Sequence, residues 1–401
     1  MKIIVIGAGI IGMSTAWRLL QDGHEVTVLD SASSTGQGSS FANGAQLSYS
    51  YVAPLADPSV WRQLPKLLTD PASPVQFRPG ADYFQYRWLL SFLAACNQRQ
   101  AYETIERLGD LASRSRQLLH ESEDLRTAEF NWSQTGKLVV YSAEPGLAAA
   151  RRQADHQIAS GTDKRALTTD ECLTLEPALA SIAHRLVGGL FSPGDETADA
   201  LLLCRELERL ITSPDKPATM LYDTRVERIR REGRKIAGLE TSRGKMEADL
   251  YVLAAGVQSR ALGRTAGINL PIYPIKGYSL SVPIASSAAA PSVSVTDIAR
   301  KVVLARLGST LRLAGAADLV GTDLKIDTRR TGQLIADAKA DFPAAANWDD
   351  AVLWAGLRPA TPTGQPIIGE CGIDNLRLNV GHGALGFTLA LGSADQLARD
   401  I

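Results

Sequence analysis

The first thirty residues carry two short apolar runs separated by an amphipathic stretch. Lys2–Ile6 and Glu25–Leu29 are rich in β-branched residues, which favour strands. Between them, apolar residues recur at the spacing of one helix face as far as about Gln21. This order predicts a strand, a helix and a second strand, which together form a βαβ unit.

Similar patterns return later in the chain. Residues 198–211 predict an amphipathic helix, and residues 219–252 predict strands joined by polar turns. Near the C-terminus, a predicted strand over residues 375–380 leads through a glycine-rich turn into a last helix over residues 385–399. The end of the chain therefore repeats the strand, glycine and helix order of its beginning.

The middle of the chain has a different pattern. Residues 102–121 and 146–160 predict long helices, whereas Lys137–Tyr141 and residues 273–282 predict strands. These elements do not continue the order of the first unit. We therefore predict a second domain formed from the middle of the sequence.

The turn after the first strand has the sequence Gly7-Ala8-Gly9-Ile10-Ile11-Gly12. Gly7 and Gly9 allow a tight turn and let a pyrophosphate approach the backbone, while Gly12 allows the helix to pack closely. The helix begins inside this motif and points its unpaired N–H groups at the loop. The pattern is typical of dinucleotide binding.

Asp30 ends the second strand of the same unit. A carboxylate there can accept hydrogen bonds from both ribose hydroxyls and would repel a 2′-phosphate. The motif thus favours FAD or NAD over NADP but does not distinguish the first two. The alternative is a related fold without cofactor, because glycine-rich turns also occur for structural reasons alone.

The charge balance narrows the classes of partner. The sequence holds 42 Lys plus Arg against 43 Asp plus Glu, a formal net charge of −1. We expect no nucleic-acid partner, because nonspecific binding to phosphates needs a surplus of cations. The basic run from Arg225 to Lys235 is interrupted by Glu227 and Glu232, and we interpret it as the solvated face of a hairpin.

The four cysteines, Cys96, Cys172, Cys204 and Cys371, are widely spaced and form no CxxC pair. They indicate neither a disulfide framework nor a zinc site. We therefore expect no bound metal and a reducing, cytoplasmic location.

No apolar run reaches the roughly 18 residues that a membrane-spanning helix needs. Residues 1–12 are apolar, but they carry phosphate-loop glycines and no cleavage site, so we interpret them as part of the fold. Residues 83–96 are the most apolar candidate and are interrupted by Gln85 and Arg87. We expect a buried helix over the active site there, although the pattern also allows peripheral contact with the inner face of the cell membrane.

Further motifs relate the chain to a known family. They are Ser39-Ser40-Phe41-Ala42-Asn43-Gly44-Ala45-Gln46-Leu47-Ser48, Gly188-Gly189-Leu190 with Asp195-Glu196-Thr197, Lys276-Gly277-Tyr278-Ser279-Leu280, Gly356-Leu357-Arg358-Pro359-Ala360-Thr361-Pro362-Thr363-Gly364 and Gly381-His382-Gly383-Ala384-Leu385-Gly386. In this order they make the sequence resemble the FAD-dependent D-amino-acid dehydrogenases over essentially its whole length. More distantly, it is similar to glycine, sarcosine and D-amino-acid oxidases.

This resemblance implies an α/β fold, α+β overall, like that of D-amino-acid oxidase. A Rossmann-like FAD-binding domain would comprise residues 1–52, 196–268 and 362–401, and an interleaved substrate domain on a mixed β-sheet would comprise residues 53–195 and 269–361. The FAD is expected to be non-covalent. No cysteine stands in the glycine-rich stretch after Asn379, where covalently flavinylated sarcosine oxidases have one.

The implied reaction removes a hydride from Cα of a D-amino acid to flavin N5. Water then hydrolyses the imino acid to a 2-oxo acid and ammonia, and the electrons pass to a quinone or another acceptor other than NAD. Two alternatives stay open. One is an oxidase of glycine, sarcosine or a proline-type D-imino acid that uses oxygen; the other is a flavin-binding subunit without turnover.

The resemblance implies four residues around the substrate. Arg358 would bind the substrate carboxylate through its planar, permanently charged guanidinium. Tyr278 would direct its hydroxyl to the same carboxylate, and Tyr51 would line the pocket from the opposite side. Alternatively, Arg358 pairs with an internal acid and Tyr278 is a core residue with a satisfied hydroxyl. We interpret His382 as a positioning residue rather than a general base, because hydride transfer from a neutral amine needs no essential base.

The family pattern also implies contacts to FAD along the chain. Many members have Asn-Ala-Gly-Gln where this chain has Asn43-Gly44-Ala45-Gln46, so the glycine is shifted by one position. The start of the last helix would stabilise negative charge on the reduced flavin pyrimidine. Besides the first glycine loop and Asp30, the implied contacts are Ser39, Ser40, Asn43, Gly44, Gln46, Leu47, Val226, Ala255, Gly256, Gly381, Gly383, Ala384, Leu385 and Gly386.

Overall fold

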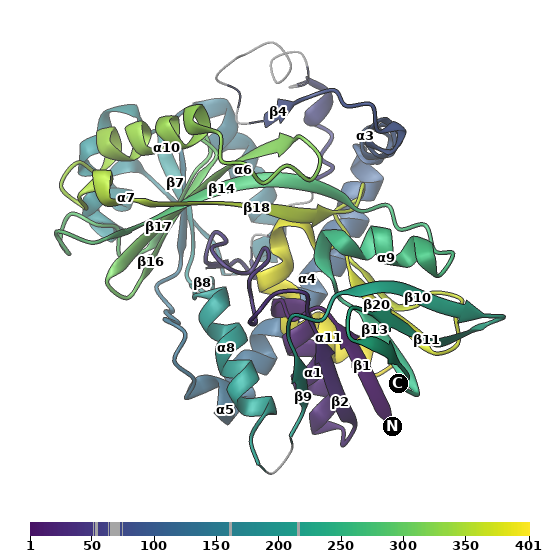
Figure 1. Cartoon of the computed structure of the whole chain (residues 1–401). Helices are drawn as coiled ribbons and strands as arrows, with labels where there is room; N and C mark the ends of the chain where they lie inside the picture. The colour runs from purple at the N-terminus through teal and green to yellow at the C-terminus, as the bar shows by residue number, and fades with distance from the viewer. Residues whose placement is uncertain are drawn as a thin grey trace.

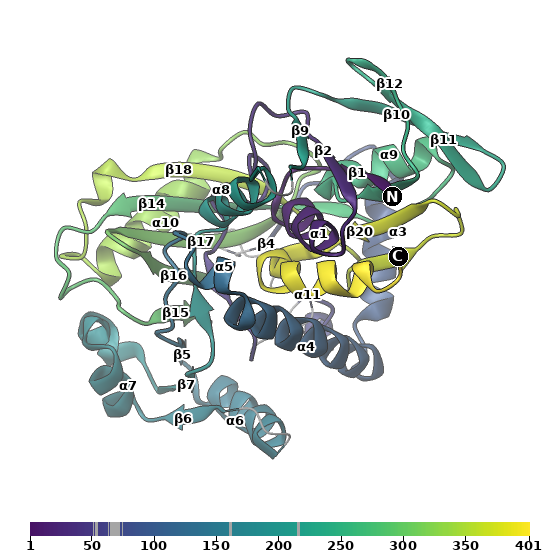
Figure 2. The same cartoon turned by 90° about the horizontal axis from the view of Figure 1, so that it is seen from below.

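The computed structural model describes the chain from Met1 to Ile401 except residues 51, 53, 54, 63, 65–72, 74, 160–162, 215 and 216. Two large β-sheets organise the described residues, and helices pack around both (Figure 1). The two chain termini lie close together on the side of the first sheet, as Figures 1 and 2 both show.

The first sheet contains the βαβ unit that the sequence predicts. Its strands in spatial order are β19 (Ile367–Glu370), β20 (Leu376–Val380), β13 (Leu250–Leu253), β1 (Lys2–Ile6), β2 (Glu25–Leu29) and β9 (Thr219–Leu221). All neighbours are parallel except β19, which closes one edge in the antiparallel direction. Helix α1 (Ile10–Gln21) connects β1 to β2, so the predicted unit is confirmed.

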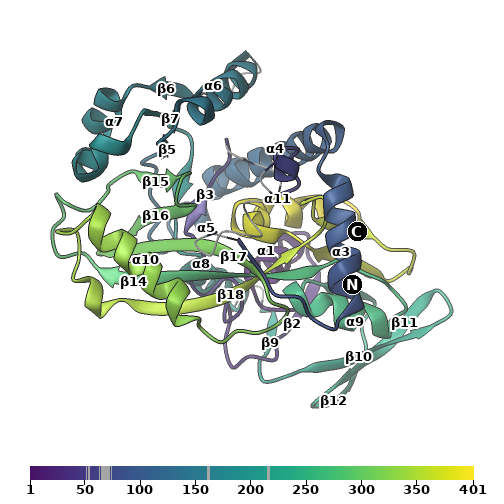
Figure 3. The same ribbon diagram turned by 90° about the horizontal axis from the view of Figure 1, so that it is seen from above.

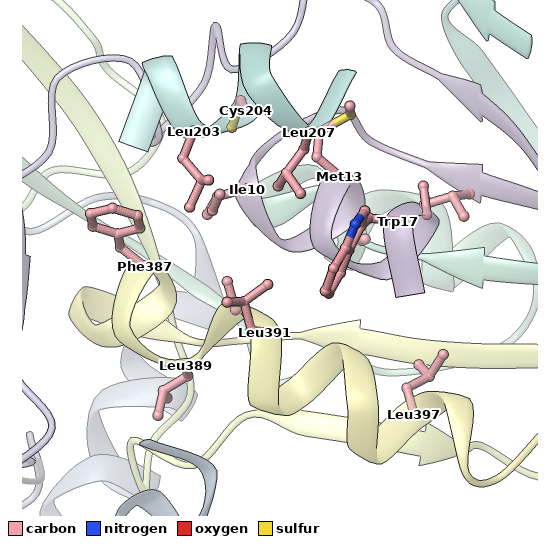
Figure 4. Packing of buried hydrophobic residues seen from close by; sticks show 14 of the residues in the cluster. Ile10, Met13, Trp17, Leu203, Cys204, Leu207, Phe387, Leu389, Leu391 and Leu397 are labelled. Carbon is pink, nitrogen blue, oxygen red and sulfur yellow. The ribbon is translucent and has the colours of Figure 1, made fainter. Parts of the chain in front are cut away.

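Both faces of this sheet are buried, as parallel pairing usually requires. Ile3 and Val5 belong to a core with α1, α8 (Ala200–Ile211) and α11 (Gly386–Ala398). The intervening residues of β1 face the other way, because side chains alternate along a strand. They pack against α9 (Ser259–Thr265) and the hairpin of β10 (Val226–Glu232) and β11 (Lys235–Thr241). Figure 4 shows α1 in the helical core, with α8 on one side and α11 on the other.

The second sheet is mixed. Its strands in spatial order are β18 (Val352–Ala360), β14 (Tyr273–Pro283), β17 (Thr310–Leu319), β16 (Val302–Leu307), β15 (Ser294–Asp297), β5 (Lys137–Tyr141), β7 (Gly188–Ser192) and β6 (Arg165–Leu167), with β4 (Val75–Phe77) beside β17. Most neighbours are antiparallel, but β5 runs parallel to β15 and β4 parallel to β17. A separate apolar core joins this sheet to α10 (Thr328–Asp341) and to the 3-10 helix η1 (Pro177–Arg185).

The other elements connect or cover the two sheets. Helix α4 packs along α11, as the views from below and above show (Figures 2 and 3). The two-stranded ribbon β3–β8 ties the segment after the first unit to the end of β7. These elements are α3 (Tyr83–Ala95), α4 (Gln98–Glu121), α5 (Glu123–Arg126), α6 (Glu144–Ala159), α7 (Thr169–Leu175), α9 (Ser259–Thr265), β3 (Gln46–Leu47), β8 (Glu196–Thr197), β10 (Val226–Glu232), β11 (Lys235–Thr241), β12 (Gly244–Met246), and the 3-10 helices η2 (Gly256–Gln258), η3 (Trp348–Asp350) and η4 (Gly383–Leu385).

The helix ends follow local chemistry. Asp199 caps α8 by accepting hydrogen bonds from the N–H groups of Leu201 and Leu202, and Thr168 and Glu171 form a reciprocal capping box at α7. Helix α4 begins four residues before the predicted start, at Gln98, because Asn97 caps it there. The basic hairpin β10–β11 has exposed arginines, which confirms the prediction of a solvated face.

Helix α3 differs from the prediction. Its Trp88 is buried against Tyr273, but Tyr83, Tyr86 and Leu90 are 78%, 40% and 68% exposed. The expectation of a buried helix over the active site is therefore wrong, because only one side of α3 packs against the protein. Among the helices of the described chain, none combines the length and the apolar content that a membrane span requires.

Candidate active site

A cavity of about 760 Å³ is lined by residues from both sheets. On one side they come from the ends of β1, β2, β13 and β20 and from the start of α11. On the other side they come mainly from β14, β17 and β18. The cavity therefore lies at the carboxyl ends of the parallel strands, where ligands bind in open α/β sheets.

The first glycine loop has no room for a side chain at Gly7 or at Gly12. Gly7 has φ +112°, and a Cβ on it would lie 2.6 Å from the carbonyl oxygen of Ala254. A Cβ on Gly12 would lie 1.8 Å from the carbonyl oxygen of Gly7, so the helix start packs directly on the loop. At the N-terminus of α1, the N–H of Ile10 donates to Ser40 Oγ at 3.0 Å. The segment carrying Ser40 is thereby held against the loop.

Asp30 extends from the end of β2 to the rim of this loop. Its two carboxylate oxygens accept hydrogen bonds from the N–H groups of Ala8 at 2.7 Å and Ala32 at 2.8 Å. Each oxygen has a further lone pair for a hydroxyl group. Asp30 also lines the cavity, so its position fits a ribose contact.

Most of the predicted site residues meet at this cavity. Gly12 lies beneath the loop, as its packing role requires, and Tyr51 lies outside the described residues. Leu47 does not line the cavity, and its side chain is part of the helical core, so its expected cofactor contact through the backbone stays a prediction. The predicted residues that line it are Gly7, Gly9, Ile10, Ile11, Asp30, Ser39, Ser40, Asn43, Gly44, Gln46, Val226, Ala255, Gly256, Tyr278, Arg358, Gly381, His382, Gly383, Ala384, Leu385 and Gly386.

Arg358 lies on β18, opposite Ile275 of β14. Its guanidinium covers Gly277, where a Cβ would come within 2.3 Å of Nη2. Nη1 donates to the carbonyl oxygen of Ala316 at 2.9 Å, and burial lowers the pKa of Arg358 while Asp318 opposes that shift. In the described part of the chain, no carboxylate oxygen lies within 4.0 Å of this guanidinium. The alternative of an arginine paired with an internal acid is thus disfavoured.

Tyr278 lines the cavity, but its hydroxyl has an internal partner. It donates to Asp318 Oδ2 at 3.2 Å, and Asp318 also forms an ion pair with Arg330. Burial and the nearby Asp318 carboxylate raise the pKa of Tyr278. A tyrosine hydroxyl has one proton, so it must leave Asp318 before it can donate to a ligand.

His382 is 3% exposed and lies just before η4, at the approach to α11. Among the described residues its Nε2 has no hydrogen-bond partner, although the atom is buried. Burial lowers the pKa of His382 to about 3, so the ring is neutral at physiological pH. A buried nitrogen without a hydrogen-bond partner at the cavity wall is consistent with a bound group that supplies this hydrogen bond.

Sequence reasoning missed several residues that line the cavity, among them Lys137, Thr296, Trp354 and Thr388. The sequence could have indicated Lys137 as a site residue, because it is a charged residue at the start of an otherwise apolar strand. Trp354 was harder to recognise as a site residue from the sequence, since a tryptophan in a strand usually means a core position. In the structure its ring covers Gly356, where a Cβ would meet the ring at 2.0 Å.

The arrangement fits FAD. The glycine loop and α1 can hold a pyrophosphate, Asp30 can hold a ribose, and the cavity extends from them to Arg358 in the second sheet. All four cysteines lie away from the cavity lining, which agrees with non-covalent binding.

Comparisons with known proteins identify the family. Residues 2–399 match the family model DAO, described as FAD dependent oxidoreductase. A "D-amino acid dehydrogenase 2" from Ralstonia nicotianae is 45% identical over 411 residues, which cover 99% of this chain and 96% of that protein. The protein of the same name from Pseudomonas aeruginosa is 43% identical over 405 residues, covering 100% and 94%.

Solved structures agree on the fold. A glycine oxidase from Bacillus cereus matches with a TM-score of 0.73 at 21% identity, over 99% of this chain and 93% of that one. The chain therefore belongs to the DAO family of FAD-dependent oxidoreductases. The predicted family, the mixed α/β fold and the FAD cofactor are confirmed, whereas the domain boundaries and the roles of single residues stay predictions.

Proposed function

We propose that this chain oxidises D-amino acids to 2-oxo acids and ammonia, with FAD as the hydride acceptor. The relatives named D-amino acid dehydrogenase support the substrate class. Within the structure, the proposal rests on Arg358, a half-buried cation at the cavity without a carboxylate within 4.0 Å in the described residues. Such a site favours an anionic ligand, because a buried charge is costly until it is paired.

Arg358 is suited to hold the substrate carboxylate. Among the described residues only Nη1 has an internal acceptor, so the other N–H groups of the guanidinium remain for two parallel hydrogen bonds to a carboxylate. Because Gly277 has no side chain, the Arg358 guanidinium can lie against the surface of β14 at this position. A carboxylate fixed there orients the rest of the amino acid, and orientation is a large part of the catalytic effect.

When bound, FAD accepts the hydride that leaves Cα. The Cα–H bond breaks with its electron pair, a C=N bond forms to the nitrogen, and water then replaces the nitrogen and releases ammonia. The amine must be neutral at that point and loses its proton beforehand. His382 is poorly suited as the base, because burial holds its pKa at about 3. We therefore expect the free amine to react without a protein base.

The reaction is tested by anaerobic titration of the yellow holoenzyme with D-alanine, D-proline, glycine and L-alanine. We expect D-alanine to bleach the flavin absorbance and air to restore it slowly. Fast reoxidation in air would make the enzyme an oxidase. Preference for glycine or D-proline would indicate that its substrates are glycine, sarcosine or proline-type D-imino acids. If no substrate bleaches the flavin, the catalytic proposal is refuted and a flavin-binding subunit is favoured.

The role of Arg358 is tested by Arg358→Ala. Loss of the half-buried guanidinium that pairs with the substrate carboxylate should lower kcat/KM for D-alanine about 100-fold or more, mainly through KM, while FAD content stays unchanged. Arg358→Lys should recover part of the loss because it keeps the charge but not the planar fork. Steady-state kinetics per bound flavin measure both, and unchanged kinetics in Arg358→Ala would refute the assignment.

We further propose a quinone as electron acceptor and peripheral contact with the cytoplasmic membrane surface. Support comes from the exposed α3 face, which we define as Tyr83, Tyr86, Arg87 and Leu90. Aromatic and basic side chains together suit the interface of an anionic bilayer. D-alanine with a water-soluble quinone under anaerobic conditions should give turnover, and NAD should not replace the quinone.

A further inference from the structure

Lys137 is a buried ammonium at the cavity that the reaction described above does not use. It opens β5, is 4% exposed and lines the cavity. In the second sheet, β5 is separated from the β18 strand of Arg358 by β14, β17, β16 and β15. The two cations therefore belong to opposite ends of the cavity wall.

Hydrogen bonds connect Lys137 to the start of α11. Its Nζ donates to Ser48 Oγ at 2.9 Å, and the N–H of Ser48 donates to Thr388 Oγ1 at 3.1 Å. Thr388 belongs to the first turn of α11, a helix whose N-terminus has no side-chain cap from any residue that the structure describes. The positive end of a helix dipole and an ammonium thus converge on one part of the cavity.

A further observation points to a ligand at this place. His382, at the approach to the same helix, has the buried Nε2 without a partner in the described residues. Lys137, Thr388 and His382 all line the cavity. A bound group that reaches this end would meet three hydrogen-bonding side chains and the helix N-terminus.

The electrostatic surroundings favour a negative charge there. Burial lowers the pKa of Lys137 to about 8, Asp195 opposes the shift, and Lys164 adds to it. The ammonium is therefore charged at pH 7 but poorly solvated. An anionic group on the cavity side would replace part of the solvation that it loses on burial.

We propose that Lys137, together with the N-terminus of α11, stabilises the negative charge of reduced FAD and so raises the reduction potential of the bound cofactor. Reduction adds charge to the flavin, whereas oxidised flavin is neutral, so a fixed cation stabilises the reduced form preferentially. The role concerns the cofactor and holds whichever amine the enzyme oxidises.

The test compares the FAD-loaded wild type with Lys137→Met, Lys137→Gln and Lys137→Arg at pH 7. Lys245→Met, on exposed β12, is the matched control. Dye equilibration measures the two-electron midpoint potential, and absorbance titration measures the dissociation constant of sulfite, which leaves the flavin pyrimidine negatively charged. Both measurements report only on protein that holds flavin. Partial loss of folded protein therefore does not change the measured potential or the sulfite dissociation constant.

We expect both neutral variants to bind sulfite at least tenfold more weakly and to lower the equilibrium constant for reduction at least tenfold, which is about 30 mV for two electrons. Lys137→Arg should restore most of the sulfite affinity and most of the midpoint potential, and Lys245→Met should change neither quantity. Unchanged potentials with a raised KM only for acidic D-amino acids would overturn the proposal and make Lys137 a substrate contact. Loss of FAD from both neutral variants, with retention in Lys137→Arg, would also overturn it, because the cation would then hold the oxidised cofactor.

Discussion

At the residue scale, the site depends on empty space as much as on charge. Arg358 can lie flat on the second sheet only because the position beneath its guanidinium is Gly277, and α1 can begin against its loop only because position 12 is a glycine. Adding one methyl group at either position would require backbone or guanidinium atoms to move. The position of Arg358 is therefore set by its strand neighbour and not by its own sequence motif alone.

This gives a prediction for Gly277→Ala. The new Cβ would come within 2.3 Å of Arg358 Nη2 and displace the guanidinium. A displacement of about 1 Å costs about 100-fold in rate, so kcat/KM for D-alanine should fall by about that factor with FAD content unchanged. Gly109→Ala on α4 is the control, since nothing lies within 4 Å of its Cβ position, and it should not change the kinetics.

His382 predicts a pH dependence of stability. Its pKa is about 3 in the folded protein and about 6.5 when unfolded, so the unfolded state binds the extra proton between these values. Stability should therefore fall as pH decreases from about 6.5 towards 3, by at most about 1.4 kcal/mol per pH unit from this group. Urea unfolding of the holoenzyme at pH 7.5 and 5.5 should show a smaller loss in His382→Gln than in wild type.

The control for this measurement is His184→Gln, because His184 is exposed on η1. That variant should show the same loss as wild type between the two pH values. An equal loss in all three proteins would mean that His382 is protonated in the folded state, contrary to its burial.

At the scale of elements, Asp395 joins the helices behind the first sheet. It lies on α11, is 2% exposed, and accepts hydrogen bonds from Arg18 of α1 at 3.1 Å and Arg114 of α4 at 2.7 Å. Burial raises the pKa of Asp395, but the hydrogen bonds from Arg114 and Arg18 outweigh it and hold the pKa at about 2. One carboxylate thus fixes how three helices meet.

Asp395→Asn should destabilise the protein by about 2 kcal/mol, because it leaves partly buried guanidinium groups without their charge partner. The contribution of Asp395 is present above about pH 4, its unfolded pKa, and is lost as pH falls towards 2. The difference between variant and wild type in urea midpoint at pH 7 should therefore shrink at low pH.

The matched control is Glu103→Gln, which removes an exposed ion pair with Arg99 on α4. Exposed pairs of this kind contribute little, so this variant should unfold like wild type. A similar effect of both substitutions would show that the burial of Asp395 is irrelevant.

At the scale of the whole molecule, residues of both sheets line the cavity, whereas the α3 face lies on the outer surface of the protein. Residues of α3 do not line the cavity, yet Trp88 of α3 donates to the carbonyl oxygen of Ala360, two residues after Arg358. The buried side of α3 and the strand that carries Arg358 are therefore directly connected. A membrane that binds α3 would therefore lie near the strand that carries Arg358.

Membrane contact predicts that the enzyme sediments with vesicles of phosphatidylglycerol and phosphatidylethanolamine. Leu90→Asp should reduce the bound fraction several-fold, because it places a charge in the apolar part of the interface. Val352→Asp, equally exposed but on β18, should bind like wild type. Equal binding of both variants would argue against α3 as the contact.

Much of the fold followed from local patterns. The parallel strands, α1 and the last helix have strong periodicity and glycine punctuation, so their existence is predicted with bounds shifted by a few residues. Helix α3 was predicted as a helix but with the wrong burial, because an apolar composition does not tell which side meets the protein. The motif around Leu47 likewise gives no information about its side chain, which packs in the helical core.

The sequence by itself determined the cofactor loop, the family and the arginine in Gly-Leu-Arg-Pro, because these depend on residues close together in the chain. Only the tertiary structure decided that Gly277 makes room for Arg358, that Tyr278 bonds to Asp318, and that Lys137 reaches the start of α11 through Ser48. Each of these contacts joins segments far apart in sequence. Local propensity fixes elements, but the pairing of distant strands and the space between them depend on how the elements pack.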